Sequence, residues 1–306
     1  MTVDIIIPVY KPDEKLKKNL IALKKQTRKP EHIFLINTEE QFFPEEVKKL
    51  LSTMPNVFVT HIKKSEFDHG GTRNMGAKMS RADIIFFMTQ DAIPANEKLV
   101  EEIVRPFSDE KVAAVYGRQM ADKKQDFLEA FTRTFNYPKE SQLKSKDDLE
   151  RLGIKTFFCS NVCAAYRRKV HEQLGGFPLK TIFNEDMIFA SKLILEGYCI
   201  FYNADAKLWH WHHYTGMQQL RRNFDLAVSQ VQYGGVFLKV KSESEGIRLV
   251  KETIIYLFRA GKFYLIPYVI YTSGCKYIGY RLGKKYEKLP MRAVRWLSMN
   301  PHYWDN

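Results

Sequence analysis

The chain has 306 residues, of which 45% are hydrophobic and 13% aromatic, and its formal net charge at pH 7 is +13. This length and composition predict a packed globular protein, either one large α/β domain with an appendage or two modest domains. The four cysteines have no paired metal-type spacing and are too few for a disulfide framework in a chain of this size, which excludes both of those classes.

The positive charge is concentrated near the end of the chain. Residues 239–306 contain thirteen Lys and Arg against five Asp and Glu. A basic tail rich in aromatic residues suits an anionic membrane surface or polymer, although a solvated basic face is commoner. The apolar run at 263–274 is shorter than the roughly 20 residues that span a bilayer, and the N-terminus has no signal-peptide pattern. We therefore expect a cytoplasmic protein, free or peripheral on the inner face of the cell membrane, with no nucleic acid partner.

Strands and helices alternate along the first 120 residues. Hydrophobic patterns predict strands at 3–9, 32–36, 57–62, 84–88 and 112–117, separated by helices at 13–25, at 45–54, up to about 79, and at 97–107. Such alternation predicts an α/β fold with a mostly parallel sheet, right-handed crossovers and flanking helices. Residues 1–120 are therefore expected to form a Rossmann-like, nucleotide-binding half.

The pattern weakens over residues 120–155, which are charged and partly helical. This stretch is either a mobile acceptor-side insertion or a long surface excursion. Strands are predicted again at 161–167, 198–202 and 207–211, with helices ending at 175, spanning 187–195, and continuing from 215 onward. We expect an acceptor half at 121–215, which completes a catalytic domain at 1–215, and a helical region at 216–306. That region packs on the catalytic domain, on a second copy in a homodimer, or on a membrane surface.

The stretch IIFFMTQDAIP, residues 84–94, runs from an apolar strand directly into Asp91. A run without a polar face predicts a strand buried on both sides, as in a parallel sheet covered by helices. Ligands bind beyond the carboxyl ends of such strands, where a carboxylate can hold a divalent cation against a phosphorylated substrate. The alternative is a turn Asp ahead of a proline, and Asp91 alone does not decide between them.

The stretch FDHGGTRN, residues 67–74, combines two glycines, an arginine and an asparagine ahead of a predicted helix. Glycines permit close backbone approach, a helix start attracts anions, and Arg73 offers two parallel donors to a diphosphate. In the alternative, a surface turn pairs Arg73 with Asp68. Ligand contact is favoured, because this loop directly precedes the strand that ends at Asp91.

Two adjacent carboxylates, Glu185 and Asp186, open the predicted helix at 187–195. Neighbours at a helix start point in different directions, so one can accept a hydrogen bond from a substrate while the other removes a proton. Acidic residues are also favoured there by the helix dipole, and capping charge is the commoner role of such a pair.

The run WHWHH at residues 209–213 has the least ordinary composition in the chain. On a strand, His210 and His212 would share one face, and neutral imidazole is a good ligand for a transition metal, with a carboxylate oxygen to complete the site. Tandem His and Trp can also simply pack a domain edge.

Taken together, these motifs resemble the inverting family 2 glycosyltransferases of GT-A fold. The shared features are a first strand with Pro8 and Tyr10, the GGTRN loop, TQDA after an apolar strand, an NED helix start and HWH further on. FDHGGTRN with TQDA is most similar to the rhamnosyltransferase branch. The resemblance covers about residues 3–215 with its motifs, and the helical tail more loosely.

The resemblance assigns Asp91 to the metal-binding carboxylate of the family's DxD motif. Thr89 stands where many members have the first Asp, which puts strict metal dependence in doubt. His210 matches the family's metal-ligating histidine, and His212 joins it in our candidate site. The implied cofactor is Mg²⁺ or Mn²⁺.

The resemblance implies Asp186 as the general base, with Glu185 beside it in the catalytic pair. Asn37 occupies the place where members often carry an Asp that contacts the nucleobase. The predicted donor contacts, taken from the strand ends and motifs, are Pro8, Tyr10, Asn37, Asp68, Gly71, Arg73, Asn74, Gln90 and Asp91.

The implied reaction is a single displacement with inversion. Asp186 deprotonates an acceptor hydroxyl, which attacks the anomeric carbon opposite the nucleoside diphosphate, while a cation on Asp91 and His210, helped by Arg73, neutralises charge on the leaving group. The branch implies dTDP-L-rhamnose as donor and a lipid-linked or polymeric bacterial surface glycan as acceptor.

Three other functions stay open at this point. The first is a family 2 glycosyltransferase that uses a UDP-hexose, and the second is a nucleotidyltransferase, which can share this sheet but lacks a glycine-rich basic signature after its first strand here. The third is a non-catalytic sugar-nucleotide-binding protein, which the Thr89 departure motivates.

Overall fold

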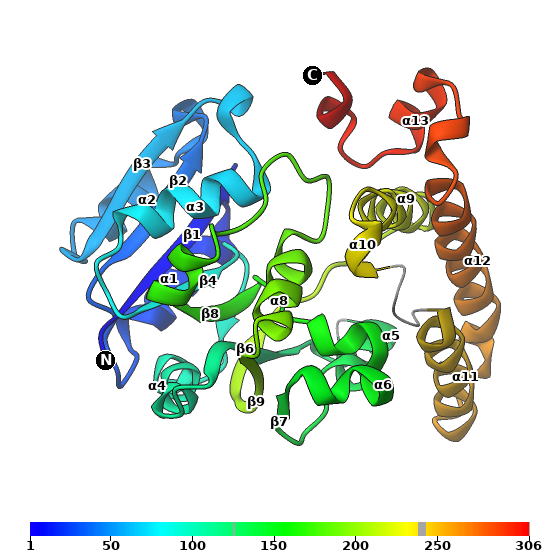
Figure 1. Cartoon of the computed structure of the whole chain (residues 1–306), viewed down its shortest axis with the longest axis horizontal. Helices are drawn as coiled ribbons and strands as arrows, with labels where there is room; N and C mark the ends of the chain where they lie inside the picture. Colours follow the sequence, from blue (N-terminus) through cyan, green and yellow to red (C-terminus); the bar gives the residue numbers. More distant parts are fainter. Residues whose placement is uncertain (125, 238–242, 306) are drawn as a thin grey trace.

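The computed structural model describes residues 1–124, 126–237 and 243–305, and its centre is a nine-stranded sheet with helices on both faces (Figure 1). The strands are β1 Val3–Tyr10, β2 Ile33–Thr38, β3 Val57–Ile62, β4 Ile84–Met88, β5 Ile93–Pro94, β6 Val112–Met120, β7 Gln142–Lys144, β8 Cys163–Arg167 and β9 Cys199–Trp209. Their order is β3-β2-β1-β4-β8-β6-β9-β5, with β7 paired to β9.

The first four strands pair in parallel, as do β6 and β9, whereas β8 is antiparallel to both of its neighbours. The short strands β5 and β7 also pair antiparallel with β9. The predicted α/β fold, a mostly parallel sheet flanked by helices with a helical C-terminal part, is confirmed, and the antiparallel β8 is an addition to it.

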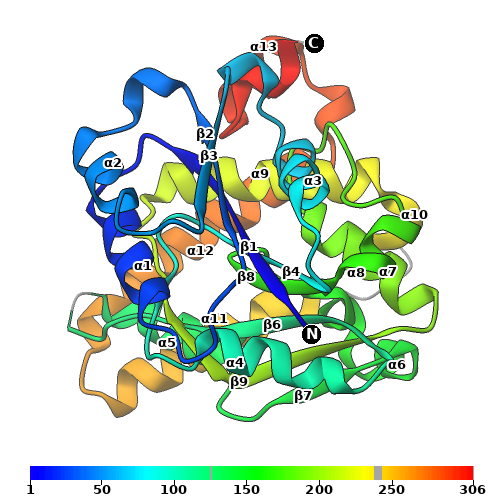
Figure 2. The same ribbon diagram turned by 90° about the vertical axis from the view of Figure 1, so that its left-hand side faces the viewer.

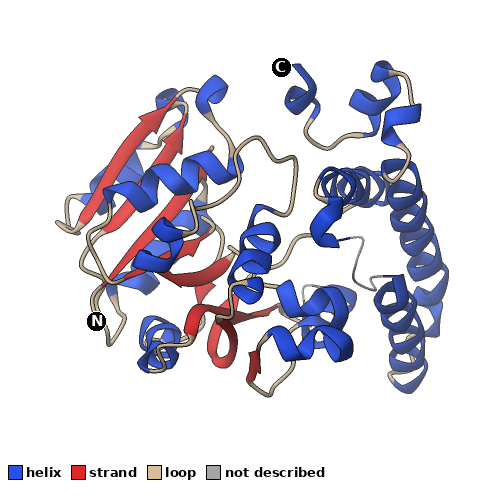
Figure 3. Cartoon of the chain, viewed as in Figure 1, coloured by secondary structure: helices blue, strands red, loops and turns tan. Residues whose placement is uncertain are grey.

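The helices enclose the sheet and then form the C-terminal part (Figure 3). Around the sheet lie α1 Glu14–Lys24, α2 Glu45–Leu51, α3 His69–Met79, α4 Leu99–Val104, α5 Phe127–Asn136, α6 Leu149–Leu152, α7 Arg168–Gln173 and α8 Glu185–Leu195. The C-terminal part contains α9 Gly216–Gln232, α10 Gly234–Phe237, α11 Glu243–Arg259, α12 Ile266–Gly283 and α13 Met291–Leu297. Within the described ranges, no helix combines the length and apolarity needed to cross a membrane.

Alternation along β4 explains its uniformly apolar sequence. Phe86 faces the core cluster that includes α1, while Phe87 faces the cluster that includes α8, and every residue of β4 is buried. Both faces of this strand are therefore buried away from solvent, as its sequence predicted. Because β4 is central, its carboxyl end delivers the following turn to the middle of the sheet edge.

Two predictions of local structure are wrong. The glycine loop at 67–74 is largely helical, because α3 begins at His69 with Asp68 as its N-cap. The predicted strands at 198–202 and 207–211 are the single strand β9, which ends at Trp209. Consequently His210 and His212 do not lie on a strand. The weakly patterned stretch at 120–155 contains α5, β7 and α6.

The C-terminal helices pack tightly through glycine. A Cβ on Gly279 of α12 would lie 2.1 Å from the carbonyl oxygen of Leu220, and one on Gly283 would lie 2.3 Å from that of Phe224. Only glycine lets the backbone of α12 come this close to α9. The chain then returns, so that its C-terminal end lies above α3 in Figure 2, where Lys64 Nζ is 3.4 Å from His302 Nε2.

Candidate active site

Three potential metal ligands meet beyond the end of β4. Asp91 lies in the turn between β4 and β5, and His210 and His212 follow β9, whose last residues pair with β5. The Nε2 atoms of His210 and His212 are 3.6 and 3.3 Å from Asp91 Oδ2 and 3.1 Å from each other. The two rings meet edge to face at 87°. The structure thus brings the three predicted ligands together, although not through a shared strand face.

Gln119, near the end of β6, fixes the tautomer of His210. Gln119 Oε1 lies 3.0 Å from His210 Nδ1 and accepts a 2.5 Å hydrogen bond from Arg133. Because a guanidinium only donates, the Gln119 atom that faces it is the amide oxygen, and His210 Nδ1 carries the proton. His210 Nε2 therefore presents its lone pair toward Asp91 and His212, as in a metal-ligating histidine.

Burial and proximity set the protonation of this cluster. His210 is 5% exposed, and burial lowers the pKa of its imidazole to about 3. Burial also lowers the pKa of His212. For Asp91, burial acts to raise the pKa, but the neighbouring imidazoles outweigh it and hold the pKa below its usual value. At neutral pH the cluster is a carboxylate with two neutral imidazoles, which suits a divalent cation.

A carboxylate with a raised pKa lies at the start of α8. Asn184 precedes the helix in the left-handed conformation, with φ at 64°, and Glu185 and Asp186 form the first turn. Asp186 is partly exposed and accepts backbone hydrogen bonds from Asn161 at 3.2 Å and from Met187 at 2.7 Å. Burial, and then the charge of Glu185, raise the pKa of Asp186 to about 7. A base with this pKa can work near neutral pH.

Glu185 has a different environment from its neighbour. Its Oε1 lies 3.2 Å from the NH1 of Arg73, which also donates to His69 O at 2.9 Å. Burial acts to raise the pKa of Glu185, but Arg73 and then His69 outweigh it and lower the pKa. Glu185 is therefore an ionised partner of Arg73, whereas Asp186 holds its proton to near neutral pH. A contact between Arg73 and a diphosphate stays a prediction.

A short segment joins the metal-ligand cluster to Asp186. Gln119 Nε2 donates to Ser160 Oγ at 3.2 Å, and the next residue, Asn161, donates its backbone N–H to Asp186. The side chain of Asn161 is itself held, since its Oδ1 accepts a 2.8 Å hydrogen bond from Tyr166. Ser160 therefore contacts Gln119, which supports the candidate metal ligands, and the next residue, Asn161, contacts Asp186. Through these two consecutive residues, the metal-ligand cluster and Asp186 belong to one site.

The predicted donor contacts near β1 and β2 lie at strand ends. Gln90 bonds both the N–H and the C=O of Tyr10, at 2.9 and 3.1 Å, and ties the end of β1 to the turn after β4. Pro8 lies in β1, two residues before Tyr10. Asn37, fully buried in β2, has an Oδ1 without a hydrogen-bond partner among the described residues. Their contacts with a donor stay predictions.

The predicted contacts in α3 have structural partners. Asp68 caps α3 through the N–H of Gly71 at 2.6 Å and also accepts a 3.1 Å hydrogen bond from the N–H of Lys180. Asn74 bonds both the N–H and the C=O of Phe177, at 2.9 and 2.8 Å. These side chains hold the loop that leads to α8, and their contact with a donor also stays a prediction.

The sequence analysis missed Gln119, Ser160 and Asn161. One signal for Gln119 was available, because a polar side chain that ends the apolar strand β6 lies at the same kind of strand end as Asp91. Ser160 and Asn161 lie in an irregular segment with no pattern, and only the folded chain brings them to the site.

A mostly parallel sheet, with candidate metal ligands beyond a central strand and a carboxylate pair at a helix start, is the arrangement expected from the resemblance to GT-A glycosyltransferases. The sequence model of the family described as "Glycosyl transferase family 2" matches residues 4–175, and the chain belongs to this family. It is therefore a glycosyltransferase.

Two curated relatives are similar over nearly their whole length. The O-antigen chain rhamnosyltransferase RfbN of Salmonella typhimurium is 40% identical, over 100% of this chain and 97% of the relative. The O-antigen chain rhamnosyltransferase WbaN of Salmonella anatum is 41% identical, over 93% of this chain and 90% of the relative.

Solved structures with a similar fold include two proteins of low sequence identity to this chain. The mannosyltransferase PcManGT from Pyrobaculum calidifontis, in complex with GDP-Man and Mn²⁺, has a TM-score of 0.56 at 16% identity, over 99% of this chain and 84% of that one. S. aureus TarS 1-349, in complex with UDP-GlcNAc, has a TM-score of 0.55 at 14% identity, over 94% of this chain and 92% of that one. At such identities the likeness concerns the fold alone.

Proposed function

We propose that the protein is an inverting rhamnosyltransferase that transfers L-rhamnose from dTDP-L-rhamnose to a hydroxyl of a bacterial cell-surface polysaccharide or its lipid-linked precursor. The observation that carries this proposal is the 40% identity to an O-antigen chain rhamnosyltransferase over the whole chain. This similarity extends beyond residues 4–175, which match the family model, into the C-terminal helices. A shared glycosyl-transfer reaction alone would not require the C-terminal helices of the two proteins to be similar in sequence.

Asp186 is the general base of the proposed reaction. With a pKa near 7, it is substantially ionised at neutral pH yet basic enough to take the proton of an attacking hydroxyl. The acceptor oxygen bonds to the anomeric carbon as the bond from that carbon to the nucleoside diphosphate breaks, and the proton goes to Asp186. Glu185 does not compete for this proton, because Arg73 holds it in the ionised state.

Asp91, His210 and His212 would hold the divalent cation, and their geometry fits that role. Two imidazole nitrogens 3.1 Å apart face each other and the carboxylate, and at least one of them carries a lone pair. A cation among them satisfies all three atoms. When bound, it would neutralise negative charge that gathers on the leaving diphosphate. A donor set with two imidazoles favours Mn²⁺ over Mg²⁺, which prefers oxygen ligands and keeps several waters.

The donor assignment is tested with a panel of dTDP-rhamnose and UDP-hexoses, with and without Mn²⁺. We expect hydrolysis or transfer to be fastest with dTDP-rhamnose, and to fall when Mn²⁺ is chelated. Preference for a UDP-hexose would contradict the rhamnosyl assignment and leave the fold and the base unaffected. Nucleotide-sugar binding without turnover of any donor would contradict the mechanism.

The C-terminal helices expose a surface that fits an anionic membrane. At the corner between α11 and α12, which we define as residues 258–264, the side chains of Phe258, Phe263 and Tyr264 are 63, 63 and 64% exposed, and Arg259 is exposed beside them. Aromatic area next to positive charge is the composition of an interfacial anchor. The proposed location is the inner face of the membrane, where a lipid-linked acceptor would be found.

The membrane contact is tested by co-sedimentation with vesicles of anionic or neutral lipid. We expect binding to anionic vesicles that is lost in the double variant Phe258→Ser/Phe263→Ser. The matched control is Ile21→Ser, since Ile21 is an exposed apolar residue on α1, away from the C-terminal helices. Concentration-dependent dimerisation that the same double variant abolishes, without vesicle binding, would show instead that the corner is a homodimer contact.

A further inference from the structure

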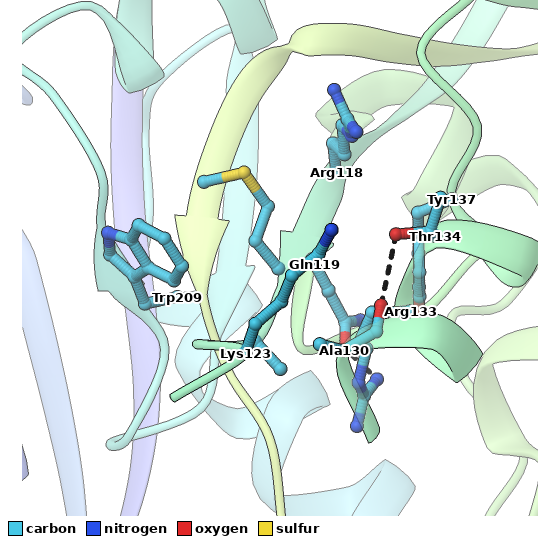
Figure 4. A pocket seen from close by; sticks show the side chains of 10 residues that line it. Arg118, Gln119, Lys123, Ala130, Arg133, Thr134, Tyr137 and Trp209 are labelled. Atoms are coloured by element: carbon cyan, nitrogen blue, oxygen red, sulfur yellow. Dashed lines mark hydrogen bonds between the residues drawn. The ribbon is translucent and has the colours of Figure 1, made fainter. Parts of the chain in front are cut away.

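A cavity of about 120 Å³ lies between the end of β6 and α5 (Figure 4). Its wall includes Gln119, which orients His210, and Trp209, the last residue of β9. This volume accommodates several water molecules and hence a phosphate group. The cavity adjoins the candidate active site, and the mechanism above gives it no occupant.

Cations line this cavity without a matching anion. Among the described residues, its lining contains Arg118, Lys123 and Arg133, and no carboxylate. Arg133 is engaged by Gln119 and, at 2.8 Å, by Glu129, so it belongs to the fixed wall. Figure 4 shows Arg118 and Lys123 beside the same space, extending from β6 and from the segment that follows it.

Arg118 is the side chain that lacks a partner. Among the described residues it makes no side-chain hydrogen bond or ion pair, and its Nε is buried without an acceptor. The residue as a whole is partly exposed, so the other N–H donors of its guanidinium stay open to water or to a ligand. A guanidinium offers parallel N–H donors that match the oxygens of a phosphate. An oxyanion is therefore the ligand whose chemistry fits these open donors.

The cavity lies between the catalytic residues and the exposed corner. On one side, Gln119 reaches Ser160, next to the Asn161 that bonds Asp186. On the other side, α5 packs against α11, where the ring of Phe131 stacks on Tyr256 with centroids 4.4 Å apart. The nearby Phe127 lies under Lys262 of the corner, 4.3 Å from its Nζ. The cavity and the corner therefore both adjoin α5.

We infer that this cavity is a subsite for a substrate phosphate, which Arg118 and Lys123 bind by charge-assisted hydrogen bonds. The inference rests on the proposed function, because it takes the occupant from the substrates of that reaction. Two sources share this chemistry: a phosphate ester that links the acceptor glycan to its carrier, and the diphosphate of the donor. The position beside α5, which packs against α11 of the proposed membrane surface, favours the acceptor phosphate.

The first experiment measures inorganic pyrophosphate binding by calorimetry, with EDTA present so that the metal-ligand cluster contributes nothing. Loss of one charge-assisted hydrogen bond predicts a Kd for Arg118→Gln that is about tenfold weaker or more. Lys124→Gln is the matched control, because Lys124 is an exposed neighbour outside the lining. Equal Kd values for Arg118→Gln and wild type, or no binding to folded wild type, would overturn the inference. This readout needs no sugar transfer, so it is independent of the rhamnosyl assignment.

The second experiment identifies the source of the phosphate. Steady-state KM values are compared for one glycan acceptor with and without a phosphate ester at its reducing end, and for the donor. If Arg118→Gln raises the KM of the phosphorylated acceptor about tenfold and leaves that of the neutral acceptor unchanged, the subsite holds the acceptor phosphate. A rise confined to the KM of the donor assigns it to the donor diphosphate. Unchanged KM values for all three substrates, in a variant with wild-type thermal stability, would overturn the subsite.

Discussion

The metal-ligand cluster and the carboxylate pair belong to one site but are held in place in different ways. Backbone pairing fixes the cluster: the β5–β9 ladder aligns Ile93 with Trp209, and the N–H of His210 donates to Met120 O at 2.9 Å. Side chains from distant elements fix the loop before Asp186. Asn74 of α3 holds Phe177 on one side of this loop.

The C-terminal helices hold the other side of that loop. Ser229 of α9 donates a 2.6 Å hydrogen bond to the carbonyl of Phe183, and Ile182 packs in a core cluster with residues of α9 and α13. Asp225, also in α9, accepts hydrogen bonds from the N–H groups of Met299 and Asn300, at 2.8 and 3.3 Å, which docks the end of the chain. The helical region therefore supports the loop before the proposed base Asp186, whereas the proposed metal ligands depend on the sheet and on α5, whose Arg133 holds Gln119.

The largest expected effect comes from replacing Asp186, which should change the rate of transfer without changing metal binding. Asp186→Asn removes the proposed general base; general base catalysis is worth about 10²–10⁴ in rate, so kcat should fall by this factor. Because the metal ligands are untouched, the Kd for Mn²⁺ should equal that of wild type. For Asp91→Asn we expect the opposite pattern, in which the main effect is a weaker Kd for Mn²⁺. Asp205→Asn, at an exposed position of β9, is the control for both assays. Transfer by Asp186→Asn at the wild-type rate would exclude Asp186 as the base.

A smaller effect is expected from the support of the metal ligands. Gln119→Leu frees the ring of His210 and its tautomer, and loss of such a support typically costs about 10–100-fold in metal affinity. Titration of activity with Mn²⁺ should show this shift, with kcat recovering at saturation. Gln173→Leu changes an exposed glutamine at the end of α7 and should leave the titration unchanged. An unaltered Mn²⁺ requirement in Gln119→Leu would contradict the assigned tautomer.

The pH dependence tests the base end without removing the base. Since Asp186 acts when ionised, kcat at saturating Mn²⁺ should rise with pH through about 7 and then level off. Glu185→Gln removes the neighbouring negative charge, so the pKa of Asp186 should fall and the rise should move to lower pH. Glu196→Gln, exposed beyond the far end of α8, should keep the wild-type profile. A profile that moves to higher pH in Glu185→Gln would contradict the coupling of the two carboxylates.

The sequence predicts the sheet end of the site better than the base end, for a physical reason. A short apolar run without a polar face fits few kinds of secondary structure other than a strand buried on both sides. The 84–94 stretch therefore identified β4 and the position of Asp91. The histidine pair was found by composition, but its strand geometry was wrong because β9 ends one residue before His210. The contact from Gln119 spans 91 residues, and no local pattern records it.

The misread start of α3 shows how packing overrides local preference. Two glycines predicted a loop, since glycine is a poor helix former. In the structure a Cβ at Gly70 would lie 2.0 Å from the carbonyl oxygen of Pro178, so this helical position needs glycine for close approach. The loop before α8 is thus pressed against α3. Such a reason depends on a segment about a hundred residues away, and the sequence alone does not reveal it.

The smallest expected effect tests whether the C-terminal helices support catalysis as the comparison requires. Ser229→Ala removes one buried hydrogen bond to the residue before Asn184, worth about 1 kcal/mol, and should lower kcat a few-fold while the Kd for Mn²⁺ stays constant. Ser191→Ala is matched, since Ser191 is equally buried and donates within α8 to Ile188 O at 2.7 Å. It should lose similar thermal stability but keep kcat. If α9 supports the proposed base, only the loss of the Ser229 contact with the loop before α8 should lower kcat. Equal kcat values for the two variants would show instead that α9 merely stabilises the fold.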